Sequence, residues 1–191
     1  VKEYFRAIRE IRPKAFVMEN VSMLSSETHR FYDSIKDHDV VTSLGVHMRE
    51  DELVLADSDY NGYSLMDIIQ TDAVADYKIS NELFQLLNVL YTNRNNDERL
   101  SKYIKNKSKL IIDEIASQSP RVKNNLDFLD RIVNMINTGQ INVCFTELGQ
   151  FIKFQKTFRL KEELDLNEII YEIENDLQTG KIIARVKSYS V

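Results

Sequence analysis

Proline restricts helices more than any other residue, and this chain of 191 residues contains only two, Pro13 and Pro120. Glycine, the next strongest helix breaker, occurs only 5 times. So few interruptions favour long helices over a turn-rich β fold. After residue 60 apolar residues recur at helical spacing, which predicts a helical bundle. The predicted helices cover residues 64–71, 81–93, 97–117, 121–137, 145–158 and 166–178, and a final strand covers 182–186.

The residues before position 60 follow a different pattern. Residues 2–11 place apolar side chains at helical spacing, and Pro13 ends the helix that they predict. The apolar run that follows predicts a short buried strand over residues 15–19, of the kind found in parallel sheets. Residues 22–36 allow a second helix, although the polar residues 25–30 could form a loop instead. Strand-like runs follow at 40–41 and 53–55, before a turn cluster at 57–62.

Glu19 directly follows the predicted strand of residues 15–19. Open α/β sheets bind their ligands beyond the carboxyl ends of the strands. Glu19 is therefore the acidic residue whose position predicts a role in catalysis or ligand binding. No metal site is expected, because His38 and His47 are too far apart in sequence for a typical ligand pair.

The run RPKAFVMENVSML, preceded by the helical run VKEYFRAIREI, resembles the Glu-Asn-Val region of DNA (cytosine-5) methyltransferases. The resemblance covers about the first two dozen residues. It implies that a cysteine thiolate adds to C6 of a flipped cytosine, whose C5 then takes a methyl group from S-adenosylmethionine. Glu19 would be the acid that stabilises this adduct at N3 and the exocyclic amine. Asn20 and Val21 would fix the turn that aims Glu19, and Arg12 would support substrate binding.

The other motifs of that family do not occur in the sequence. There is no Pro-Cys pair, no Gly-rich loop for S-adenosylmethionine and no Gln-Arg-Arg-type motif, and the single cysteine is Cys144. We therefore interpret the chain as a fragment of a parent methyltransferase, inactive alone, with residues 1–60 in the catalytic domain and 61–191 in a helical insert. The fold class expected is mainly α, with an N-terminal helix–strand–helix unit resembling part of a Rossmann-like methyltransferase sheet. The alternative is a non-enzymatic helical module that binds DNA or protein.

The net charge of the chain limits which partners are expected. The net charge of −5 argues against binding of nucleic acid along the whole chain, because neutralising phosphate groups needs a surplus of Lys and Arg. Two local features could still contact DNA, although a solvated helix face and core packing explain them more simply. They are the basic residues Arg99, Lys102, Lys105, Lys107 and Lys109, and the aromatic residues Phe145, Phe151, Phe154 and Phe158.

The cellular setting is expected to be the cytoplasm of a bacterial or phage-infected cell, within a restriction-modification system. A single cysteine fits a reducing compartment, and no apolar run is long enough to span a membrane. DNA is the expected partner, through the intact enzyme. Target recognition, self-association and a bare spacer are all compatible with the helical segment.

Overall fold

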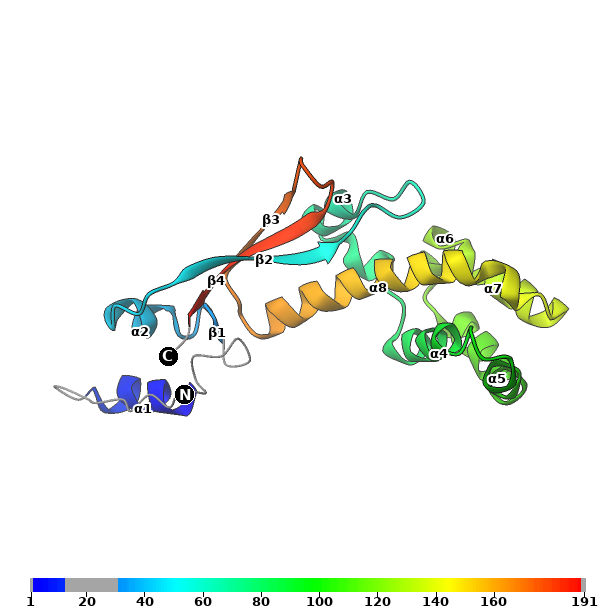
Figure 1. Ribbon diagram of the computed structural model, residues 1–191, viewed down its shortest axis with the longest axis horizontal. Helices are drawn as coiled ribbons and strands as arrows, with labels where there is room; N and C mark the ends of the chain where they lie inside the picture. The colour runs from blue at the N-terminus through cyan, green and yellow to red at the C-terminus, as the bar shows by residue number, and fades with distance from the viewer. Residues whose placement is uncertain (1, 13–30, 190–191) are drawn as a thin grey trace. The chain divides into compact units, whose positions relative to one another are not determined.

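The computed structural model describes residues 2–12 and 31–189. The described chain is mainly helical with a small antiparallel sheet (Figure 1). It divides into two compact units, one of residues 1–57 with 160–191 and one of residues 58–159. We call them the sheet unit and the helical unit, and describe each by itself.

The sheet unit is organised around strand β4 (Ile182–Tyr189). Strand β2 (Arg49–Ala56) pairs along one edge of β4, from Arg49 opposite Ser188 to Ala56 opposite Ile182. Strands β3 (Tyr171–Asn175) and β1 (Phe31–Tyr32) share the other edge, β3 beside residues 182–186 and β1 beside residues 188–189. All these pairings are antiparallel. Figure 1 shows β2, β4 and β3 side by side.

Strand β4 is buried along most of its length, which fits its central place in the sheet. Arg185 and Lys187 are exposed, and the other residues of the strand are buried. The exposed Arg185 donates to Glu174 on β3 at 2.6 Å and pairs with Glu52 on β2 at 3.2 Å. Exposed charge pairs of this kind contribute little to stability, so apolar burial and the strand ladder stabilise the sheet.

Two helices complete the described N-terminal part of the sheet unit. Helix α1 (Lys2–Ile11) confirms the predicted helix over residues 2–11. Helix α2 (His38–Ser43) packs Val41 against Tyr189, with further partly buried apolar side chains around this pair. The last turns of helix α8 (Phe145–Leu166) also belong to this unit.

The helical unit contains the other helices, several of which begin at a capping residue. Ser80, Asn96 and Ser119 accept hydrogen bonds from backbone N–H groups in the first turns of α4, α5 and α6, as N-caps do. Gly139 ends α7 in the left-handed region, at a φ of 70°. The elements are α3 (Leu65–Gln70), the 3-10 helix η3 (Ala73–Asp76), α4 (Asn81–Thr92), α5 (Asp97–Ser117), α6 (Pro120–Asn125), α7 (Phe128–Thr138), the 3-10 helix η4 (Ile141–Cys144) and the first turns of α8.

An aromatic cluster forms much of the core of the helical unit. Phe151, Phe154 and Phe158 of α8 are buried, and Tyr60 stacks on Phe154 with 4.7 Å between ring centroids. Phe128 of α7 packs against Phe151 at 5.2 Å. Buried aromatic rings are among the largest contributors to core stability. The predicted core of α4, with Leu83, Leu87 and their neighbours, is also confirmed.

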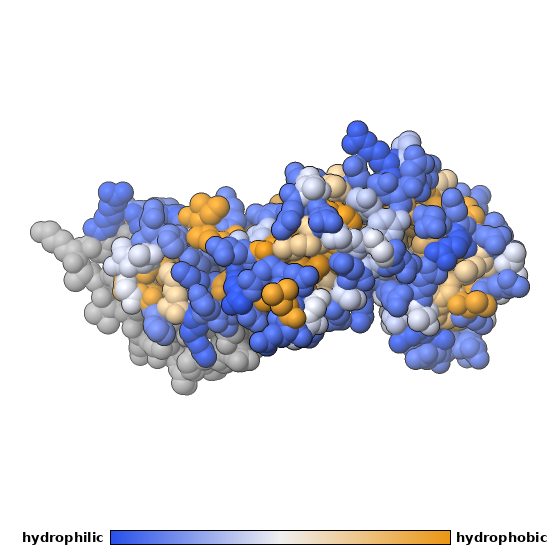
Figure 2. Space-filling model, turned by 90° about the horizontal axis from the view of Figure 1, so that it is seen from above, coloured by the Kyte–Doolittle hydropathy of each residue, from blue (hydrophilic) through white to orange (hydrophobic). Residues whose placement is uncertain are grey.

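The described surface is mostly hydrophilic with small apolar patches on the face in Figure 2. Val54, Leu160 and Ile170 are among the partly exposed apolar side chains. Scattered apolar residues of this kind are normal on a protein surface.

Four sequence predictions are wrong. Residues 166–178 do not form a helix, because residues 171–175 alternate and pair with β4 as β3. The predicted helix over 121–137 is split into α6 and α7, because the carbonyl of Asn125 accepts from the Tyr63 hydroxyl at 2.5 Å. Residues 40–41 lie in α2 rather than in a strand. Residues 31–36 of the predicted helix 22–36 form β1 and a turn.

The predictions for residues 13–30 lie outside the described residues. They include the strand over 15–19 and therefore the Rossmann-like sheet, which stays a prediction. The role of residues 61–191 as a helical insert also stays a prediction. The described structure groups residues 160–191 with the sheet unit.

Candidate functional site

Glu19, Asn20 and Val21, the residues singled out by the sequence, lie outside the described residues. Arg12 is described, and it is exposed directly after the end of α1. Its φ of 48° is in the left-handed region, which is uncommon for a residue other than glycine but frequent where helices end. Arg12 is thus presented to solvent at a helix end, and its contact with a substrate stays a prediction.

A polar cluster begins shortly after the undescribed segment. Asp33 is only 1% exposed, and its Oδ2 lies 2.8 Å from Nδ1 of His38. Asp33 Oδ1 has no hydrogen-bond partner among the residues that the structure describes. Because a buried, unpaired carboxylate oxygen is costly, such an atom marks a place where a donor is expected. Sequence reasoning missed this pair, because it considered His38 only as a possible metal ligand.

The backbone around Asp33 is held by the sheet unit itself. Its N–H donates to the carbonyl of Lys187 at 2.7 Å, and its carbonyl accepts from Ile170 N–H at 2.9 Å. His38 follows at the start of α2, where its N–H donates to the carbonyl of Ser34 at 2.8 Å. The strand edge and the following turn therefore bring the carboxylate and the imidazole together.

The Asp33–His38 pair holds an imidazole in a defined orientation. A carboxylate at Nδ1 orients an imidazole and fixes its tautomer, leaving Nε2 for another partner. The His38 side chain is 46% exposed, so the imidazole is partly accessible from solvent. Nearby, burial and then the Asp37 and Asp33 carboxylates raise the pKa of Tyr189 to about 12, so this phenol stays neutral.

Among the described residues no group of three or more His, Cys, Asp or Glu side chains could hold a metal ion. The turn at residues 57–62 is explained by a local contact, because Asp59 accepts from Leu65 N–H at 2.9 Å. These residues therefore form a structural turn.

The single cysteine is not arranged for catalysis. Cys144 is buried, and its thiol donates to the carbonyl of Ile141 at 3.1 Å. Burial raises its pKa to about 11, so the thiol is protonated near neutral pH. A cysteine nucleophile reacts as the thiolate, so Cys144 is an inert core residue.

The two sequence features proposed to contact DNA have different outcomes. Phe151, Phe154 and Phe158 are buried in the core, so they have no face available for a nucleic-acid base. Phe145 is only half-buried. The basic residues Arg99, Lys102, Lys105, Lys107 and Lys109 of α5 are all exposed. Their contact with DNA stays a prediction.

Comparison with known proteins gives one match. The family model for C-5 cytosine-specific DNA methylase matches residues 1–43. The match contains Glu19 and, in the described part, α1, Arg12, the Asp33–His38 pair and α2. No curated protein and no solved structure matches the chain. The family match supports a methyltransferase relationship through the N-terminal segment. Among the described helices, none has the length and apolar character to cross a membrane.

Proposed function

We propose that this chain is part of a DNA (cytosine-5) methyltransferase, which transfers a methyl group from S-adenosylmethionine to C5 of cytosine in DNA. The observation that carries the proposal is the family match over residues 1–43, which includes Arg12-Pro13 and Glu19-Asn20-Val21. C-5 DNA methylases use S-adenosylmethionine and act on DNA. The same match supports DNA as partner. We also propose a cytoplasmic restriction-modification setting.

Glu19 is the proposed catalytic acid. Addition of a thiolate to C6 of cytosine moves electron density toward N3, and the Glu19 carboxyl donates its proton to N3 as this charge develops. The remaining carboxyl oxygen accepts from the exocyclic amine. A carboxyl that is protonated near neutral pH needs a raised pKa, which burial normally supplies. Asn20, Val21 and Arg12 hold the acid and the substrate in place.

The thiolate must come from residues outside this chain, because Cys144 is a buried thiol that donates to Ile141. The sequence also contains no Gly-rich loop to hold S-adenosylmethionine. We assign no residue of this chain to the cofactor, and we expect the 191-residue chain alone to transfer no methyl groups. Detectable transfer by the purified chain would contradict this proposal.

The test is Glu19→Gln in the full-length enzyme that contains this chain. Glutamine keeps the size but cannot supply the proton, so methyl transfer should fall about 10²- to 10⁴-fold. DNA binding, measured separately, should stay within twofold of the parent enzyme. Glu10→Gln is the matched control, because Glu10 is an exposed acid of α1 paired only loosely with Arg6, at 3.8 Å. An unchanged transfer rate in Glu19→Gln would reject the catalytic role.

The alternative function is a non-enzymatic helical module that binds DNA or protein. It is favoured by one observation, that residues 58–159 form a compact unit outside the family match. Under this alternative the full-length protein transfers no methyl groups, whatever residue stands at position 19. The parent enzyme's own activity therefore separates the two functions.

A further inference from the structure

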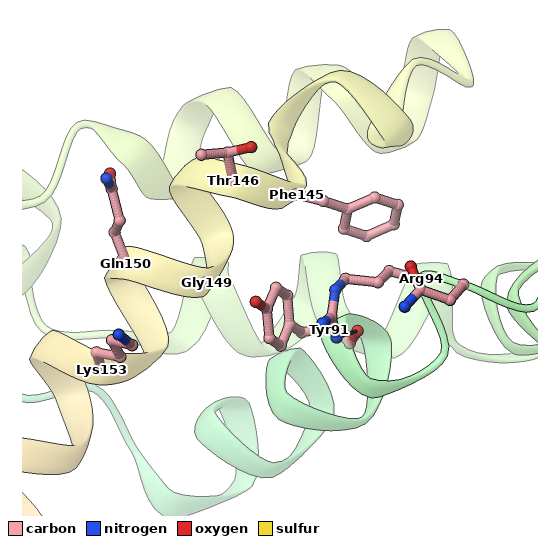
Figure 3. A pocket seen from close by; sticks show the side chains of 8 residues that line it. Tyr91, Arg94, Phe145, Thr146, Gly149, Gln150 and Lys153 are labelled. Carbon is pink, nitrogen blue, oxygen red and sulfur yellow. Dashed lines mark hydrogen bonds between the residues drawn. The ribbon is translucent and has the colours of Figure 1, made fainter.

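A groove of about 440 Å³ opens in the helical unit, within the size range of ligand sites. One side is formed by the last turn of α4 and the residues that follow it, and the other by the first turns of α8. Figure 3 shows Tyr91 and Arg94 on one side and Phe145, Gly149 and Lys153 on the other. The groove lies outside residues 1–43, so the family match says nothing about it.

The wall of this groove is built by a close approach of two helices. A Cβ atom added to Gly149 would come within 2.7 Å of the Tyr91 hydroxyl oxygen and within 2.9 Å of its ring carbons. Glycine weakens a helix relative to alanine, and the space needed by the Tyr91 ring explains its presence in α8. The Tyr91 ring therefore packs directly against the α8 backbone at Gly149.

Arg94 is fixed against the same ring. The carbon of its guanidinium group lies 3.9 Å from the Tyr91 ring centroid, and Nη1 donates to the Tyr91 carbonyl at 3.0 Å. A guanidinium held over an aromatic ring is a preorganised cation, because its side-chain freedom is already restricted. Figure 3 shows this group beside Tyr91, with the Phe145 ring across from it.

The chemistry of the lining suits a phosphate-bearing ligand. Arg94 and Lys153 supply positive charge, and among the residues that the structure describes no Asp or Glu lines the groove. Asn95 and Gln150 add amide groups that can both donate and accept hydrogen bonds. Residues 58–159 carry one more basic residue than acidic residues, in a chain whose net charge is −5. The helical unit is thus close to neutral, and the acidic excess of the chain lies outside it.

We propose that this groove binds a nucleic-acid strand, with phosphate groups at Arg94 and Lys153 and a base against Phe145. An acidic peptide would satisfy the two cations but would leave the half-buried aromatic ring and the amide groups without a role. A nucleic-acid strand uses all three, because its phosphates pair with cations and its bases stack on aromatic rings and hydrogen-bond to amides. The inference does not depend on methyl transfer.

The test is binding of labelled oligonucleotides to the 191-residue chain, measured by fluorescence anisotropy. The probes are a single-stranded DNA oligonucleotide and its duplex. The double variant Arg94→Gln with Lys153→Gln should lose at least tenfold in affinity for the single strand. The slope of log K against log salt should fall by about 0.7 for each phosphate group that no longer pairs with a cation. The matched control, Arg121→Gln with Lys156→Gln, removes the same charge from two exposed positions of the helical unit that do not line the groove, and should change affinity less than twofold.

Two further single variants help to separate a loss of binding from a folding defect in the double variant. Lys153→Gln alone removes an exposed cation and should weaken binding about threefold or more, with the circular-dichroism melt recorded to check that the variant is folded. Phe145→Ala should weaken binding of the single strand about tenfold, since stacking of a base is removed. Equal reductions of affinity in the groove and control double variants would overturn the inference. An unchanged affinity in Phe145→Ala would also overturn it. Absence of binding to both oligonucleotides, or equally tight binding of a poly-glutamate peptide, would overturn it as well.

Discussion

Replacing Gln155 by leucine tests how the helical unit is held together. Gln155 is fully buried on α8, where Oε1 accepts from Ile79 N–H at 3.0 Å and Nε2 donates to the Tyr77 carbonyl at 2.8 Å. Leucine has a similar size but offers neither group, so both backbone atoms lose their partner. An unpaired buried group costs about 1–3 kcal/mol, and Tyr77 is only half-buried. We therefore expect the free energy of unfolding to fall by about 2–4 kcal/mol.

Urea and thermal unfolding of the 191-residue chain, followed by circular dichroism, would measure this change. For a unit of this size the midpoint temperature should fall by about 10–25 °C. The matched control is Gln150→Leu, the same change at an exposed position of the same helix, which should stay within about 0.5 kcal/mol. Amide exchange at Ile79 should accelerate only in Gln155→Leu. Equal stabilities of the two variants would refute the reasoning from buried hydrogen bonds.

Three further predictions concern single residues. Gly149→Ala should destabilise the helical unit by about 1–3 kcal/mol, because its Cβ meets the Tyr91 ring; stabilisation in urea unfolding, as helix propensity alone gives, would contradict this. Cys144 should react with a thiol reagent at neutral pH only as fast as the chain unfolds, because its thiol is buried and its pKa is about 11; rapid labelling of the folded chain would contradict this. The free energy of unfolding should fall as pH rises from about 10 toward 12, because Tyr189 ionises near 10 when unfolded but only near about 12 when folded. Tyr189→Phe should reduce that pH dependence, and an unchanged slope would count against it.

Where local sequence and tertiary packing agree, the fold was predictable. The Ser80 cap and the helical spacing of Leu83, Leu87 and Leu90 predict α4 to within a residue, because capping and apolar burial both act inside one helix. The strand over 182–186 was also predicted, and the structure extends it to Tyr189. In these elements each local signal points to the same structure.

Predictions failed where a distant partner decides the local structure. Residues 171–175 become a strand because they pair with β4, a contact that their own sequence does not specify. The end of α6 depends on the Tyr63 hydroxyl, far away in sequence. The sheet unit joins residues from both ends of the chain, so a division by position along the sequence cannot separate the two units.

The candidate sites show the same limit. The Asp33–His38 contact depends on how a strand edge turns into α2, and no motif in the sequence marks it. The groove depends on Gly149 meeting Tyr91, two residues that only the fold brings together. Glu19 differs, because its role follows from a short motif and a family match. That role stays a prediction.

The most direct test of the central claim is the modified-base content of DNA from cells that express the full-length protein. Nucleoside mass spectrometry would identify the product, and the Glu19→Ala variant would serve as comparison. Our account predicts 5-methylcytosine in DNA from the parent protein and a strong reduction with Glu19→Ala. Absence of 5-methylcytosine, or equal amounts with the parent and the variant, would contradict it.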